Sequence, residues 1–67
     1  MKVLLSGISR EIGYQVIDAF YTVLSGMNYP ITAHRDDMLT FVDVDEGFKK
    51  TTIKYDIRTR SIVLYHT

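Results

Sequence analysis

Apolar residues between Ser9 and Gly26 recur every three or four positions, which is the spacing of an amphipathic helix. Ser9 has the side chain of a helix N-cap, and Glu11 would lie favourably in the first turn. Gly26 suits the left-handed position after the last turn, and Pro30 prevents the helix from continuing. The pattern therefore predicts one helix over residues 10–25.

Two apolar stripes lie side by side on this expected helix and leave only a narrow polar wedge. The first stripe is wide enough to pack on a sheet and comprises Ile12, Val16, Ala19, Phe20, Val23 and Met27. The second stripe comprises Tyr14, Ile17, Tyr21 and Leu24. Because a sheet covers one side of a helix, the second stripe has two interpretations. Either the tyrosines lie at the rim of the core with their hydroxyls in water, or the stripe contacts a second molecule.

From residue 31 onward the hydrophobic alternation changes to a period of two, which is typical of strands. The candidates are rich in β-branched and aromatic residues and span residues 31–35, 38–44, 49–57 and 61–66. Short polar turns separate them, so neighbouring strands are expected to be antiparallel and to form a meander. Residues 2–5 form either an edge strand or an apolar lead into the helix. The expected fold is α+β, with one amphipathic helix on three or four antiparallel strands.

The last hairpin sets which side chains lie beneath the helix. A two-residue turn at Thr59–Arg60 would pair Tyr55 with Leu64. The residues expected on the helix side are then Ile53, Tyr55, Ile57, Ile62 and Leu64. Val63 and Tyr65 would point to the opposite, open face of the sheet.

Residues 38–44 are apolar on both faces, and their register stays open because a slip of one residue exchanges the two faces. We place Val42 and Val44 with Val63 and Tyr65 on the open face. Exposed apolar patches on small proteins usually mark interaction sites, although single exposed apolar residues are common. The sequence therefore leaves both a binding patch and scattered exposure as interpretations.

The chain has 67 residues, no cysteine, and eight basic against eight acidic residues. We expect one small domain over residues 1–67, without disulfides. A core of this size barely offsets the conformational entropy of folding, which favours oligomerisation or a bound partner. No apolar run approaches the roughly 18 residues that span a bilayer. The apolar start is too short for a signal peptide, so a cytoplasmic location without a membrane partner is expected.

The first residues resemble the nucleotide-binding turn of the short-chain dehydrogenase family, Thr-Gly-x-x-x-Gly-x-Gly after a strand. The positions that match or nearly match are Ser6, Gly7, Ile12 and Gly13. The resemblance implies a nucleotide cofactor at the helix N-terminus. Glu11, however, stands at the middle glycine, where a carboxylate adds bulk and negative charge against phosphate. The hairpins over residues 31–66 leave no room for a doubly wound sheet, so no cofactor is expected.

Catalytic and metal-binding constellations are not expected either. The acidic turn over residues 43–47 has Phe48 where a calcium loop needs its glycine. His34, Asp36 and Asp37 share one tight turn, where three ligands rarely converge. No serine is placed beside a histidine and an orienting acid. The sequence thus predicts a protein that is not an enzyme.

Nucleic-acid binding is the alternative function. Five of the eight basic residues lie close together in sequence: Lys49, Lys50, Lys54, Arg58 and Arg60. Tyr55 and Tyr65 would stack on bases beside them. Acidic residues over 43–46 are expected to neutralise part of this patch across the hairpin.

The surplus apolar surface favours a non-enzymatic protein-binding module. Such a module self-associates, or it binds and regulates or inhibits a larger partner protein. The predicted partner-binding residues are Tyr14, Ile17, Tyr21 and Leu24 on the helix, and Val42, Val44, Val63 and Tyr65 on the open sheet face.

Overall fold

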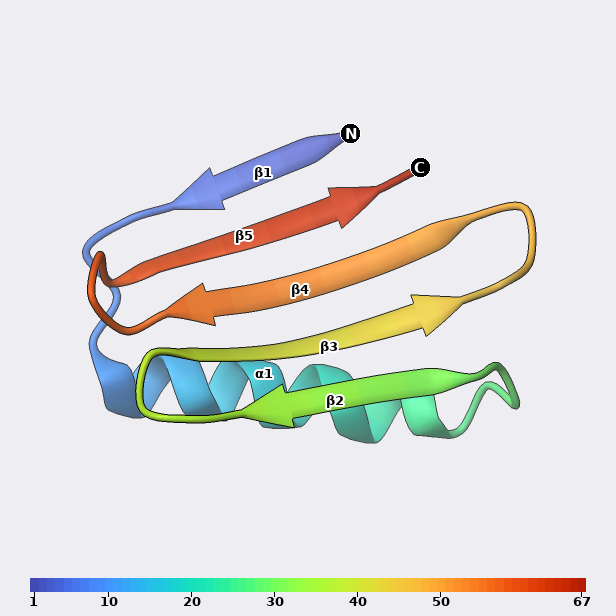
Figure 1. The fold of residues 1–67 in the computed structure, drawn as a ribbon, viewed down its shortest axis with the longest axis horizontal. Helices are drawn as coiled ribbons and strands as arrows, with labels where there is room; N and C mark the ends of the chain where they lie inside the picture. The colour runs from blue at the N-terminus through green and yellow to red at the C-terminus, as the bar shows by residue number, and fades with distance from the viewer.

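One helix packs on one face of a five-stranded antiparallel sheet in the computed structural model, which describes residues 1–67 (Figure 1). The elements are β1 (Lys2–Leu5), α1 (Arg10–Ser25), β2 (Ile31–Arg35), β3 (Leu39–Asp45), β4 (Lys50–Asp56) and β5 (Ser61–His66). The sheet order is β1-β5-β4-β3-β2, so β2 to β5 form a meander and β1 adds an edge strand beside β5. The predicted α+β fold is confirmed, and residues 2–5 are a strand.

Helix α1 spans the predicted residues, and the Ile12 N–H donates to the Ser9 hydroxyl at 3.3 Å. The predicted left-handed conformation of Gly26 is wrong, because its φ is −80°. The Gly26 N–H instead bonds to the Val23 carbonyl at 3.3 Å, which tightens the last turn. The left-handed residue is Asn28 (φ 61°), a residue type that tolerates this conformation. Helix α1 lacks the length and apolar character needed to cross a membrane.

The three hairpin turns share one hydrogen-bonding pattern, which favours the meander. Each turn follows an aspartate whose carboxylate accepts the backbone N–H two residues further on, at 2.8–2.9 Å. These aspartates are Asp36, Asp45 and Asp56. An aspartate in this role stabilises a turn through contacts within the turn itself, so local interactions favour a reversal of the chain after each strand.

The register of the last hairpin differs from the predicted one by two residues. Asp56 pairs with Ser61 across a four-residue turn, and Tyr55 pairs with Ile62. The two-residue turn at Thr59–Arg60 is therefore wrong, since the Asp56 side chain bonds to the turn backbone. A shift of two residues leaves every side chain on its predicted face. Ile57 lies in the turn, where it packs against the edge of the core.

The contact between Gly13 and Tyr55 sets the orientation of the helix on the sheet. A Cβ atom at Gly13 would lie 2.7 Å from the Tyr55 ring, so only glycine allows this approach. The Tyr55 side chain is fully buried, and its hydroxyl donates to the Ile8 carbonyl at 2.7 Å. The core around this contact comprises Ile17, Val42, Val44, Ile53, Tyr55 and Ile62.

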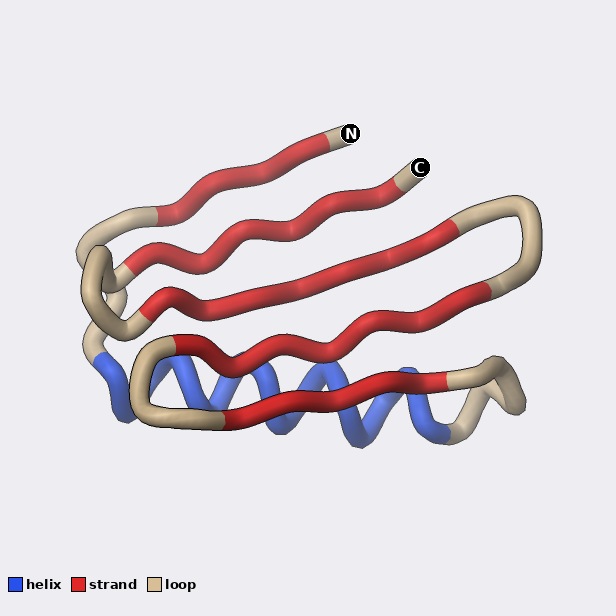
Figure 2. The backbone as a smooth tube through the Cα atoms, in the orientation of Figure 1, coloured by secondary structure: helices blue, strands red, loops and turns tan.

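Helix α1 packs on β2, β3 and β4, whereas β5 and β1 extend beyond it (Figures 1 and 2). A helix is about 10 Å wide and strands lie about 4.8 Å apart, so one helix covers little more than two strands. We call β2, β3 and β4 the covered half of the helix side, and β5 and β1 the uncovered half, although Ile62 at the start of β5 still belongs to the core.

Candidate protein-interaction surface

An apolar groove runs beside α1, above the uncovered half of the sheet. It encloses about 220 Å³ and is lined by hydrophobic side chains alone: Val3, Leu5, Ile8, Ile12, Val16, Phe20, Ile53, Ile62 and Leu64. The strands form its floor and the flank of α1 forms its wall. Leu5 is 54% exposed on this floor. Contiguous exposed apolar surface of this kind is typical of interaction sites.

The helical wall continues outward as a lateral stripe, which comprises Ile12, Val16, Ala19 and Val23. These residues are spaced by four, three and four positions, as are the contact residues of a coiled coil. Ile12 is 48% exposed and Val23 is 68% exposed, so much of the stripe is open to solvent, although Val16 packs against the edge of the core. The groove and the lateral stripe together form one apolar surface, of which the strands supply the floor and the helix supplies the side.

The second helix stripe, for which the sequence left both the rim of the core and a partner contact open, packs largely against the core. Ile17 is 2% exposed in the core, and Leu24 packs against it. Tyr14 meets the Tyr55 ring edge-on at 6.4 Å between centroids. Of the predicted helical partner residues, only Tyr21 is exposed.

The stripe expected to pack on the sheet is mostly the lateral stripe. Both stripes are apolar enough to be buried, and the contact of Gly13 with Tyr55 decides between them. Phe20 and Val16 still reach the edge of the core, because they lie where the two stripes meet. Met27 follows the end of the helix and is exposed.

The predicted placement of Val42 and Val44 on the open face is wrong. Both are buried beneath α1, because Val42 pairs with Ile53 and so lies on the same face as that core residue. Val63 and Tyr65 do lie on the open face, opposite in phase to Ile62. Their contact with a partner stays a prediction.

The open face mixes apolar and charged side chains, unlike the groove. Tyr65 lies between two ammonium groups, with Lys2 Nζ 5.5 Å and Lys54 Nζ 5.2 Å from its ring centroid. The His34 ring stacks on Phe41 at 5.4 Å between centroids. A shallow depression of about 460 Å³ is lined by Leu4, Leu39, Lys54, Asp56, Arg58, Thr59, Ser61, Val63 and Tyr65.

The predicted basic patch is spread along β4, with Lys54 within the strand and the other four basic residues at its two ends. Lys49 and Lys50 lie where β4 begins, whereas Arg58 and Arg60 follow its last residue. A strand of this length separates the two groups by about 20 Å. Arg58 also pairs with Asp56 at 3.5 Å. Tyr55 is buried beneath the helix, so it cannot stack on a base.

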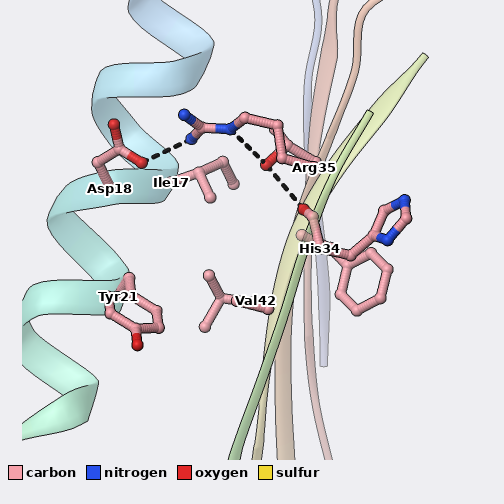
Figure 3. A pocket seen from close by; sticks show the side chains of 9 residues that line it. Ile17, Asp18, Tyr21, His34, Arg35 and Val42 are labelled. Carbon is pink, nitrogen blue, oxygen red and sulfur yellow. Dashed lines mark hydrogen bonds and ion pairs between the residues drawn. The ribbon is translucent and has the colours of Figure 1, made fainter. Parts of the chain in front are cut away.

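A cleft of about 330 Å³ separates α1 from the edge strand β2 (Figure 3). Arg35 closes one end, since its guanidinium donates to the Asp18 carboxylate at 2.6 Å. The same guanidinium lies 4.4 Å above the centre of the Tyr14 ring. The His34 ring points away from the helix, toward the open face. Arg35 therefore joins the helix to the covered half from the side opposite the groove.

Two aspartates with perturbed pKa values lie at hairpin turns. A hydrogen bond with His34 lowers the pKa of Asp36 to about 2, with further lowering by backbone N–H donors. At Asp56, partial burial raises the pKa, but hydrogen bonds from Arg58 and Thr59 outweigh it and lower the pKa overall. No three histidine or acidic side chains converge in a geometry that could hold a metal ion. These carboxylates serve the turns.

Comparison with known proteins finds no match for this chain among protein-family models, characterised proteins or solved structures. Functional inference therefore rests on its own surfaces.

One sequence signal could have identified the groove. A glycine in the middle of a helix costs about 1 kcal/mol relative to alanine, so Gly13 implies a close contact on its face. That criterion would have placed Gly13 and Ile17 against the sheet and left the lateral stripe outside.

Proposed function

We propose that this chain is a non-enzymatic protein-binding module that self-associates through the apolar groove and the lateral stripe. The single observation that carries the proposal is the absence of any polar residue among those lining the groove. The core is small, with 8 of 67 residues buried. A second copy that covered the groove would add apolar contacts to a domain whose own core is limited.

A second copy suits this surface because the surface is self-complementary. A two-fold interface uses the same patch on both subunits, so the patch must supply both a projection and a receiving floor. The lateral stripe projects from α1, and the floor around Leu5 and Leu64 receives. Gln15 and Thr22 flank the stripe on its solvent side, so no like charges oppose each other there.

The required interface is modest in area. A standard interface removes about 800 Å² from each partner, roughly a sixth of the 4590 Å² surface of this chain. The chain also has a net charge of zero, which limits repulsion between identical copies.

A larger protein that this chain regulates or inhibits would bind to the open face of the sheet. The groove lies on the opposite side of the sheet, so a second copy leaves Val63 and Tyr65 accessible. Lys2 and Lys54 beside Tyr65 form no ion pair within the chain, so they remain available to an acidic partner surface.

Light scattering over a protein concentration series tests the proposal. Wild type should approach twice the monomer mass, whereas Val23→Lys should stay monomeric. Lysine has a higher helix propensity than valine, and its positive charge interacts favourably with the C-terminal end of the helix dipole. This variant should therefore fold. Met38→Lys is the matched control, because Met38 is 54% exposed in a turn away from the groove. A monomeric wild type at about millimolar concentration, or association by Val23→Lys equal to wild type, would overturn the proposal.

A further inference from the structure

We infer that two copies pair with their α1 helices parallel, forming a two-helix layer between two sheets. The inference rests on the proposed self-association and adds the arrangement of the copies. It follows from where α1 lies on its sheet and from two-fold symmetry.

The helix layer of one copy is half filled. Helix α1 runs along the strands on the side of the covered half (Figure 1). The groove lies beside it, with Val3, Leu5 and Leu64 of β1 and β5 in its lining. A helix laid in the groove would have its axis about 8–10 Å from α1. If that helix is α1 of a second copy, symmetry requires the first α1 to lie in the partner's groove as well.

Only one direction of the two-fold axis meets this requirement. An axis perpendicular to the sheet would place both sheets in one layer, where they overlap before the helices become neighbours. An axis in the sheet plane and across the strands would superpose the two helices. An axis parallel to α1 and between the helices places each helix over the other copy's uncovered half. Rotation about a parallel axis keeps the helix direction, so the helices run parallel.

The side chains fit this arrangement. Val16 lines the groove, and Val23 lies one heptad further along the same lateral stripe, so each would approach its own symmetry mate. Ile12 and Ala19 lie further round the helix, on the side that would face the partner's floor near Leu5. Ala19 is small and permits close approach of the partner's strands.

The arrangement also fixes what the assembly presents to its surroundings. Both open faces point outward, on opposite sides of the two-helix layer. Each carries one Tyr65 with its neighbouring lysines, so the assembly has two identical and separate surfaces for a further partner.

Disulfide trapping tests the arrangement, and the native chain contains no cysteine that would interfere. Val23→Cys should form a covalent dimer on mild oxidation, since symmetry-related residues near the axis meet the distance limit for a disulfide. In a mixture of Ile12→Cys with Val23→Cys, parallel helices keep these positions about 16 Å apart along the axis, so no mixed disulfide should form. Met38→Cys is the matched control and should form no disulfide-linked dimer, because Met38 lies away from the groove.

The outcomes separate this inference from the proposed function. A mixed Ile12–Val23 disulfide would mean antiparallel helices and overturn the inference. An uncrosslinked Val23→Cys in a sample that light scattering finds dimeric would overturn it as well, leaving the proposed self-association intact. A monomeric sample at every concentration would overturn both.

Discussion

The covered and uncovered halves of the helix side are built from the same kinds of residue. Val42 and Ile53 in the covered half are each 2% exposed. Val3 and Leu5 in the uncovered half lie on the same side of the sheet and are 40% and 54% exposed. The difference lies in coverage, because one helix is too narrow for five strands. The chain therefore has an apolar sheet surface that its own helix leaves open.

The same contrast appears around the circumference of α1. Ile17 faces the covered half and is buried, whereas Val23 in the lateral stripe is 68% exposed. Both are β-branched apolar residues on one helix, so hydrophobicity does not distinguish them. The contact of Gly13 with Tyr55 does, because it brings the side of the helix that carries Gly13 against the sheet.

The largest expected effect separates the two sides of the helix. Ile17→Ala should lower the free energy of unfolding by about 2–5 kcal/mol, because it leaves a cavity in the core. Val23→Ala is the matched control and should change it by less than about 0.5 kcal/mol in the monomer. Urea unfolding at a concentration where the protein is monomeric measures both. Equal losses would mean that the two sides of α1 do not differ.

Gly13→Ala should have the next largest effect, a loss of about 1–3 kcal/mol, because the added methyl group collides with the buried Tyr55 ring. Gly26→Ala is the control with opposite sign. Gly26 has a helical φ and ordinary space around it, so alanine should stabilise by about 0.4–1 kcal/mol. Thermal or urea unfolding measures both, and a neutral Gly13→Ala would remove the proposed basis for the helix orientation.

Tyr55→Phe should lower the free energy of unfolding by about 0.5–1.5 kcal/mol, since it removes the hydrogen bond to the Ile8 carbonyl. Tyr65→Phe on the open face loses no hydrogen bond within the chain and should be close to neutral. The comparison sharpens the contrast between the buried and open sides of the sheet. A neutral Tyr55→Phe would mean that the hydroxyl does not stabilise the contact between β4 and the segment around Ile8 that leads into α1.

We expect the smallest effect from the pH dependence of stability at the turns, because apolar contacts and not ionised groups stabilise both halves of the sheet. The pKa of Asp36 is lowered from 3.8 to about 2 in the folded chain. The unfolded chain therefore binds more protons between these values, so this contribution to stability is complete above about pH 4 and is lost as pH falls through about 2. NMR titration of the Asp36 carboxyl should give that midpoint. A midpoint near 3.8 would contradict the turn geometry.

Local chemistry in the sequence was sufficient to predict most of the fold. The spacing of apolar residues and the N-cap residue Ser9 identified α1, and the polar turn residues identified the hairpins. The conformations of Gly26 and Asn28 depend on how the last helical turn tightens, which residue type alone does not specify. The phase of Val42 and Val44 depends on the length of one turn. Which helix stripe packs on the sheet depends on a tertiary contact between Gly13 and Tyr55, whereas the hydrophobic pattern alone favoured the first stripe.

In the proposed dimer, a second copy covers the uncovered half of the sheet. Isotope-filtered NOE spectroscopy on a mixture of labelled and unlabelled chains tests it most directly. We expect intermolecular NOEs between the Val23 methyl groups of the two copies, and between the Ile12 methyl groups and the floor around Leu5 of the other copy. We expect none from Val63 on the open face. Intermolecular NOEs confined to the open face, or their complete absence at millimolar concentration, would contradict it.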